Sequence, residues 1–337
     1  MRPYYPIRVY DDSINKQLVS HISAKAAGKY MYGWRSNSKD KNDHGHWHVF
    51  LCSHDSSQMK QIHDLTSEIQ QTNNELYGLW TYLQRHYIGN KKLHRVYING
   101  YTYGTDGYLH RDDPFFKDEG PSSPYAETLI LYLNEEWDAN WGGETSIFTD
   151  QKEIQRSILP KFGRLLIFDG QKLHASRPLS RCCGVLRRVL VFKTLSTEVG
   201  NENIIDKLYN ITINKKHSGK TFFEHLINTS NIAIRLGADD AVADACKFHS
   251  IYGTEFYNDV PTGITRDWVV SLIGAKAEEL VHIFCNTKNR FDAFVNSYSK
   301  DRSELNKNLL FIEYCNLLEQ TGGNQKTEKI KQLIFSQ

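Results

Sequence analysis

The chain lacks the features that mark secreted, membrane-spanning or nucleic-acid-binding proteins. Its 6 cysteines have no regular spacing and no Cys-x-x-Cys pair, which argues against a disulfide framework and a common zinc site. No apolar segment of the secretory type follows Met1, and no hydrophobic run approaches the length of a membrane span. The formal net charge is only +2, which gives no strong attraction to nucleic acid. We expect a reduced, cytoplasmic protein.

Length and pattern predict two domains. A chain of 337 residues with 40% hydrophobic content can form two packed cores. Strand-like runs stop near residue 196, and amphipathic helical segments follow to the end. We expect a first domain over residues 1–197, with its core at about 97–194, and an all-helical second domain over residues 204–337. Helical spacing over residues 57–87 predicts long helices that pack against one sheet of the first domain.

Two histidines and an aspartate form the main candidate site. In a strand, residues i and i+2 share a face, so His110 and Asp112 can point into one cavity while Arg111 points away. His174 follows a second predicted strand, Arg164 to Phe168, and its turn. Two imidazoles and one carboxylate make a facial Fe(II) site that leaves coordination positions open.

An arginine pair follows the second histidine. Arg187 and Arg188 stand at the start of a further strand-like run, and a guanidinium can grip the carboxylate of a co-substrate with two hydrogen bonds. Strand alternation lets only one of the two arginines face inward. These late strands favour a barrel-like sandwich with the metal at its open mouth.

The segment over residues 97–194 resembles the prolyl 4-hydroxylase-like type of Fe(II)/2-oxoglutarate-dependent oxygenases. The resemblance rests on motifs that occur in the family's order. They are YTYGTDGYLHRD at 101–112, LILYLN at 129–134, WGGET at 141–145, PKFGRLLIF at 160–168, HASRP at 174–178 and RRVLVF at 187–192. The resemblance implies an α+β fold, with a double-stranded β-helix (jelly roll) and flanking helices, followed here by the all-α domain.

The resemblance also implies roles for individual residues. The iron ligands would be His110, Asp112 and His174. Arg187 would pair with the distal carboxylate of 2-oxoglutarate, with Tyr132 as a second donor and Tyr101 at the rim of the pocket. The segment RCCG at 181–184 lengthens the turn before the arginines, so Arg188 remains a rival to Arg187. The chemistry needs no general base, so no catalytic residue is assigned beyond the metal ligands.

The implied reaction is hydroxylation of a C–H bond, with succinate and CO2 as co-products. Fe(II), 2-oxoglutarate and O2 would be needed, and ascorbate is included among the expected cofactors. A prolyl residue in a peptide or protein is the preferred substrate. A small-molecule or nucleotide-related hydroxylase is the alternative, because relatives of this fold act on varied substrates. The loop at 113–125 is expected to act as a lid over the site.

The second domain resembles an uncharacterised helical family related to HD-type phosphohydrolases. The resemblance rests on His217, His225 and His249. Ser250 stands where the His-Asp pair of true HD domains has its aspartate, so the metal site would be degenerate. A domain that binds a ligand or partner is favoured over a phosphohydrolase acting through this domain. The sequence does not define the oligomeric state.

Overall fold

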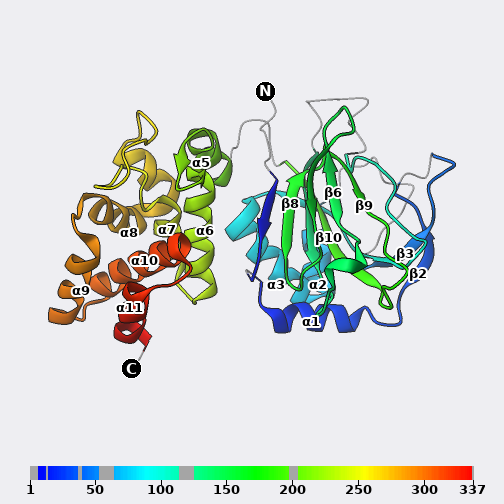
Figure 1. The fold of residues 1–337 in the computed structure, drawn as a ribbon, viewed down its shortest axis with the longest axis horizontal. Coiled ribbons are helices and arrows are strands. Elements are labelled where there is room, and N and C mark those ends of the chain that lie inside the picture. Colours follow the sequence, from blue (N-terminus) through cyan, green and yellow to red (C-terminus); the bar gives the residue numbers. More distant parts are fainter. Residues whose placement is uncertain are drawn as a thin grey trace. The chain divides into compact units, whose positions relative to one another are not determined.

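The computed structural model describes residues 7–12, 14–36, 40–52, 64–113, 125–196 and 204–335. Contacts divide the chain into one unit of residues 1–205 and a second unit of residues 206–337, and each is described by itself (Figure 1). The domain boundary expected at 197–204 falls mainly on residues outside the described ranges, so it stays a prediction. Within the described ranges, no helix is both long and apolar enough to cross a membrane.

The first unit contains two antiparallel sheets. The larger has seven strands in the order β1-β8-β5-β10-β4-β3-β2, and the smaller has three in the order β7-β6-β9. The strands of the larger sheet are β1 (Arg8–Tyr10), β2 (Met31–Trp34), β3 (His46–Phe50), β4 (Lys92–Tyr101), β5 (Tyr125–Tyr132), β8 (Leu165–Asp169) and β10 (Arg187–Leu195). Those of the smaller sheet are β6 (Thr145–Phe148), β7 (Ile154–Ile158) and β9 (Leu173–Ser176).

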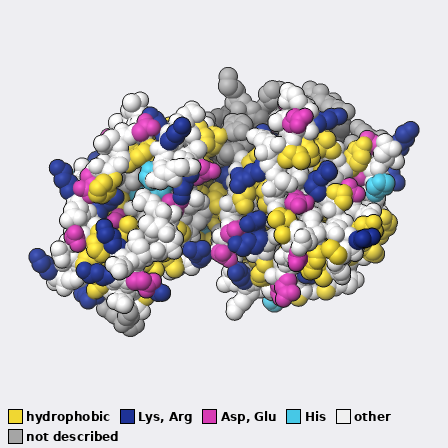
Figure 2. Space-filling model, in the orientation of Figure 1, with side chains coloured by type: hydrophobic (Ala, Val, Ile, Leu, Met, Phe, Trp, Pro, Cys, Tyr) yellow, Lys and Arg dark blue, Asp and Glu magenta, His cyan; other side chains and the backbone are white. Residues whose placement is uncertain are grey.

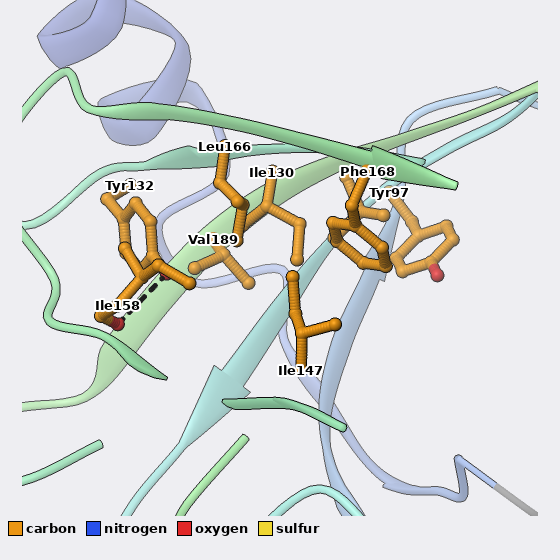
Figure 3. Close-up of a cluster of buried hydrophobic side chains, with 9 residues drawn as sticks. Tyr97, Ile130, Tyr132, Ile147, Ile158, Leu166, Phe168 and Val189 are labelled. Carbon is orange, nitrogen blue, oxygen red and sulfur yellow. Dashed lines mark hydrogen bonds between the residues drawn. The ribbon is translucent and has the colours of Figure 1, made fainter. Parts of the chain in front are cut away.

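Apolar side chains from both sheets meet in one core. Ile147 of β6 and Ile158 at the end of β7 pack against residues of the larger sheet, among them Ile130, Phe168 and Val189 (Figure 3). Alternate residues of each strand point into this layer, as expected for a sandwich of two sheets. The expected α+β fold with a jelly-roll core of two sheets is confirmed.

Helices flank this sandwich (Figure 1). They are α1 (Lys16–Lys25), α2 (Thr66–Thr72) and α3 (Asn74–Leu83), with a π-helical turn at Gln84–Ile88 and a 3-10 turn at Ala139–Trp141. On α3, Trp80 is fully buried and stacks on Phe192 of β10, on the face of the sheet away from the core. Within the described residues, the helical spacing expected at 57–87 corresponds to α2, α3 and the π-helical turn. The two α-helices are separated at Asn73, whose side chain caps α3, and residues 57–63 lie outside the described ranges.

The second unit is helical apart from one short hairpin. Its elements are α5 (Ile204–Thr212, which starts at the division), β11 (Lys216–His217), β12 (Lys220–Thr221), α6 (Phe222–Arg235), α7 (Asp240–Phe248), α8 (Arg266–Asn286), α9 (Arg290–Lys300), α10 (Glu304–Thr321) and α11 (Gln325–Phe335). Thr221 and Glu224 form a reciprocal capping box at the start of α6. Gly274, with a φ of 80°, kinks α8.

Basic and acidic side chains are interspersed on the visible surface of both units in Figure 2. This distribution agrees with a formal net charge of only +2. Such mixed surfaces provide no extended field of one sign on this face.

Candidate functional site

An isolated antiparallel bridge brings His110 and His174 together. Each residue donates its backbone N–H to the carbonyl of the other, at 3.1 Å from His110 and 3.0 Å from His174. The centroids of the two imidazole rings lie 4.3 Å apart. His174 belongs to β9, so the bridge extends the smaller sheet by one pair. No continuous strand covers residues 110–112, which corrects the expectation of a strand there.

The carboxylate of Asp112 lies against both rings. Its Oδ1 is 3.3 Å from Nε2 of His110, and its Oδ2 is 3.4 Å from Nε2 of His174. Between them in sequence, Arg111 instead pairs with the exposed carboxylate of Asp150 at 2.9 Å. The alternating directions expected from the His-x-Asp spacing are therefore present, although the backbone forms a bridge and a bend rather than a strand.

Backbone carbonyls fix the orientation of the two imidazoles. Nδ1 of His110 lies 2.7 Å from the carbonyl of Tyr108, and Nδ1 of His174 lies 3.0 Å from that of Lys172. With the proton on Nδ1, each ring donates to its carbonyl and presents the lone pair of Nε2 towards Asp112. Burial lowers the pKa of His174 to about 4, which favours its neutral, metal-binding form at neutral pH.

The donor set fits an Fe(II) ion. One ligand atom from each of His110, Asp112 and His174 lies within 4.8 Å of the others. Two nitrogen donors and one carboxylate oxygen, on rings held by backbone carbonyls, match the facial set of non-haem Fe(II) oxygenases and leave further positions for small ligands. The three residues that the sequence analysis selected are thus brought together.

Two further residues hold Asp112 and were missed by the sequence analysis. Nζ of Lys193 lies 2.5 Å from Oδ1 of Asp112, and the hydroxyl of Thr128 donates to Oδ2 at 2.7 Å. Burial alone would raise the pKa of Asp112, but the positive charge of Lys193 brings it well below its usual range. Strand alternation from Arg187 would have placed Lys193 on the inward face, and this was the available signal.

A cavity of about 390 Å³, counted with its solvent-open part, contains these ligands. It is lined by Tyr97, Asn99, Tyr101, His110, Asp112, Thr128, Ile130, Thr145, His174, Ser176, Arg187, Val189 and Val191. Its lining combines apolar side chains with a few convergent polar groups, as small-molecule sites do. The same cavity therefore contains the cluster of possible metal ligands and a buried arginine.

The guanidinium of Arg187 is fixed inside this cavity. Only 1% of the residue is exposed. Nε donates to the carbonyl of Gly143 at 2.6 Å, and Nη2 donates to the hydroxyl of Thr145 at 2.9 Å. The guanidinium carbon lies 5.4 Å from the ring centroids of both Tyr101 and Tyr132. Such a held, planar cation is suited to bidentate binding of a carboxylate.

The two tyrosines keep their hydroxyl protons. Burial raises the pKa of Tyr101 to about 12 and also raises the pKa of Tyr132. The hydroxyl of Tyr132 donates to Thr145 at 2.7 Å, and that of Tyr101 accepts from Asn99 at 3.3 Å. Tyr101 lines the cavity, whereas Tyr132 lies beside Arg187 without lining it. The hydroxyl of Tyr101 is therefore a hydrogen-bond donor at the cavity wall, while that of Tyr132 is directed to Thr145.

Arg188 has a different position from its neighbour. It is half-buried, and its backbone N–H donates to the side chain of Asn134 at 2.7 Å. It does not line the cavity, whereas Arg187 does. The lid expected at 113–125 lies mostly outside the described residues, since the structure describes nothing of residues 114–124.

In the second unit, His225 and His249 form a buried pair. Their Nε2 atoms lie 3.1 Å apart. Nδ1 of His225 faces a carboxylate oxygen of Glu319 at 2.7 Å, and Nδ1 of His249 faces the carbonyl of Cys246 at 2.8 Å. Because each Nδ1 faces an acceptor, both protons are drawn to Nδ1, and two Nε2 lone pairs then face each other. The pair needs a shared proton or a bound cation between its Nε2 atoms.

His217 joins this pair by stacking. Its ring centroid lies 3.9 Å from that of His225, with an angle of 10° between the planes. His217 belongs to strand β11 and not to a helix, so a hairpin rather than helix packing brings it there. Among the described residues, these three histidines do not form a cluster with all ligand atoms within 4.8 Å.

Comparisons with known families match both units. Residues 96–193 match the family described as 2OG-Fe(II) oxygenase superfamily, and residues 210–289 match a domain of unknown function, DUF6817. The resemblance to Fe(II)/2-oxoglutarate oxygenases is confirmed for this segment. The first unit thus contains a segment that matches an oxygenase family, and that family implies Fe(II), 2-oxoglutarate and O2. The second match carries no activity to the helical unit.

Solved structures of prolyl hydroxylases are similar to the first unit. A Pseudomonas putida prolyl-4-hydroxylase shares 17% identity over 57% of this chain and 93% of its own, with a TM-score of 0.37. A Trichoplax adhaerens prolyl hydroxylase was solved in complex with a hypoxia inducible factor oxygen degradation domain peptide fragment. It shares 15% identity over 56% of this chain and 83% of its own, with a TM-score of 0.38. A viral collagen prolyl hydroxylase from Paramecium Bursaria Chlorella virus-1, in complex with 2OG, shares 17% identity over 56% of this chain and 96% of its own, with a TM-score of 0.35.

Proposed function

We propose that the protein is a dioxygenase that hydroxylates a prolyl residue in a peptide or protein and releases succinate and CO2. The observation that carries the proposal is one cavity containing His110, Asp112 and His174 together with the buried guanidinium of Arg187. When bound, Fe(II) with 2-oxoglutarate and O2 supplies the oxidation of the C–H bond. The cysteine usage supports a cytoplasmic setting.

The residues of the chain bind and orient the reactants. His110, Asp112 and His174 would hold the iron, with both rings oriented through Nδ1. Arg187 would receive the distal carboxylate of 2-oxoglutarate, and Arg188 is the rival that lies off the cavity. No proton has to be removed from the substrate by a side chain, so the site's work is to position the reacting groups and to keep water out.

Apolar side chains enclose the space between the arginine and the metal ligands. Ile130, Val189 and Val191 line this cavity from two neighbouring strands of the larger sheet. A low-polarity wall strengthens the hydrogen bonds between Arg187 and a bound carboxylate. It also supports the choice of a five-carbon dicarboxylate that is charged at its ends and apolar in the middle.

The prolyl substrate rests on the motif resemblance over residues 97–194. A small-molecule or nucleotide-related hydroxylase remains the alternative within the same chemistry. Proline-rich peptides and free amino acids, offered in parallel and examined by mass spectrometry, separate the two. An added mass of one oxygen on a peptide proline supports the first. Oxidation of small molecules alone would overturn the preference for peptides.

The test of the enzyme class is 2-oxoglutarate-dependent succinate formation. Protein loaded with Fe(II) without O2 should release succinate once O2 is added, and ascorbate should prolong this turnover if it is a cofactor. His174→Ala should abolish release, whereas exchange of the exposed His21 for Ala should not change it. Full activity of His174→Ala would contradict the assignment of the metal ligands.

A second candidate function belongs to the helical unit. The buried pair of His225 and His249, with Nδ1 of His225 fixed by Glu319, favours a site that binds a cation or ligand. This site would make the unit an HD-like phosphohydrolase or, as we prefer given Ser250, a ligand-binding domain. Turnover of nucleotides or phosphoesters with divalent metals, lost in His249→Ala, would support the phosphohydrolase. Inactivity with every divalent metal offered would exclude it.

A further inference from the structure

A buried lysine contacts the carboxylate of the candidate metal site. Lys193 lies on β10, directly opposite Thr128 of β5, and both side chains reach Asp112. The side chain of Lys193 is 8% exposed and that of Asp112 is 2% exposed. A lysine this deeply buried is rare unless it is paired. Here the partner is also the only anionic member of the proposed metal site.

The two contacts on Asp112 differ in charge. The hydroxyl of Thr128 holds Oδ2 by a neutral hydrogen bond, while the ammonium of Lys193 holds Oδ1 and adds a positive charge. The backbone N–H of Asp112 also donates to the carbonyl of Gly170 at 3.0 Å. The carboxylate is therefore held in place without Lys193, and the distinctive contribution of the lysine is its charge.

That charge acts against any cation bound at the same carboxylate. A nearby ammonium draws electron density from the ligand oxygen and repels the ion directly, and the repulsion grows with the charge of the ion. The repulsion energy from the ammonium is therefore about 1.5 times as large for a triply charged ion as for a doubly charged one. Burial keeps this interaction from being screened by water or salt.

We propose that Lys193 is a positioning residue that acts through Asp112 to make the site favour Fe(II) over Fe(III). The inference rests on the proposed function of the first unit. It goes beyond that function by assigning to this chain a device that keeps the iron in its reduced state between turnovers. The cost is weaker binding of divalent metal than the same three ligands would give without the lysine.

Three substitutions separate the charge of Lys193 from its hydrogen bond. Lys193→Arg keeps both, Lys193→Gln keeps a donor for Oδ1 without the charge, and Lys193→Met removes both. Lys161→Gln is the matched control, because Lys161 forms an exposed pair with Asp11 at 2.9 Å. Thermal unfolding of each variant of the full chain shows which of them fold, and the glutamine variant decides the question if the methionine variant does not.

Two readouts are independent of turnover: the Kd for Co(II), measured by absorbance without O2, and the midpoint potential of bound iron. We expect Lys193→Gln to bind Co(II) at least tenfold more tightly. Its preference for Fe(II) over Fe(III) should fall at least tenfold, which lowers the potential by about 59 mV. Lys193→Arg and Lys161→Gln should match the wild type.

Unchanged affinity and potential in Lys193→Gln, with metal binding lost in Lys193→Met, would overturn the inference and leave Lys193 as a structural support. Failure of the wild type to bind any divalent metal would instead overturn the proposed function and this inference with it. The two failures are therefore distinguishable in the same set of titrations.

Discussion

Replacement of Arg187 by lysine tests the co-substrate site most directly. Lysine keeps the positive charge but offers a single nitrogen in place of a planar fork. It cannot serve the carbonyl of Gly143, the hydroxyl of Thr145 and a bidentate carboxylate at once, as the guanidinium can. We therefore expect one charge-assisted hydrogen bond to 2-oxoglutarate to be lost, worth about 1.5–3 kcal/mol. This loss raises the Kd by a factor of about 10–150.

The assay is calorimetric titration of 2-oxoglutarate into protein loaded with Mn(II) in the absence of O2. Arg188→Lys is the matched control, since its parent side chain does not line the cavity, and its Kd should stay within a factor of about two of the wild type. Weaker binding in Arg188→Lys together with an unchanged Kd in Arg187→Lys would refute the assignment of the clamp. A melting curve for each variant ensures that folded proteins are compared.

Three further predictions concern stability. Gly143→Ala should destabilise the first unit by about 2 kcal/mol or more, because φ is +72° and the new Cβ would lie 2.5 Å from the side chain of Leu179. Chemical denaturation measures this loss of stability, and an unchanged denaturation midpoint would contradict the prediction. Asn73→Ala removes the side-chain cap of α3 and should lower the stability of the first unit by about 1 kcal/mol, which is measured as a Tm lowered by about 2–4 °C. An unchanged Tm would mean that the cap does not contribute to stability. In the second unit, the contacts of Glu319 with His225 and a lysine lower its pKa from 4.5 to about 2 despite burial. Its folded pKa lies below the unfolded one, so its stabilising contribution is present above pH 4.5 and is lost as pH falls towards 2. The Tm difference between wild type and Glu319→Gln should narrow over that range, and a constant difference would refute the linkage.

Local signals predicted much of the second unit. Thr221 with Glu224 three residues later marks the start of α6, and the observed helix follows directly at Phe222. Gly274 is a second local signal, because glycine tolerates the positive φ at which the backbone of α8 kinks. Caps and glycines act over a few residues, so a single sequence carries this information without knowledge of the tertiary fold.

Helix ends that depend on competition between neighbours are harder to predict from a single sequence. Asp11 and Asn15 are both suitable helix caps, but Asp11 pairs with Arg164 and Lys161, and Asn15 caps α1. The separation of α2 from α3 has the same origin, because apolar spacing continues across Asn73, where the side chain caps the next segment.

The register of β10 explains why the choice between the arginines needed a structure. Arg187 lies opposite Tyr101 of β4, and this register, kept from Arg187 to Lys193, turns the odd-numbered side chains of that part of β10 inward. Alternation by itself states that only one of Arg187 and Arg188 enters the cavity. Once the register is known, the same rule that selects Arg187 also brings Lys193 to Asp112. The co-substrate arginine and the lysine beside the metal ligands are therefore one consequence of a single strand register, and a slip by one residue would remove both from the site.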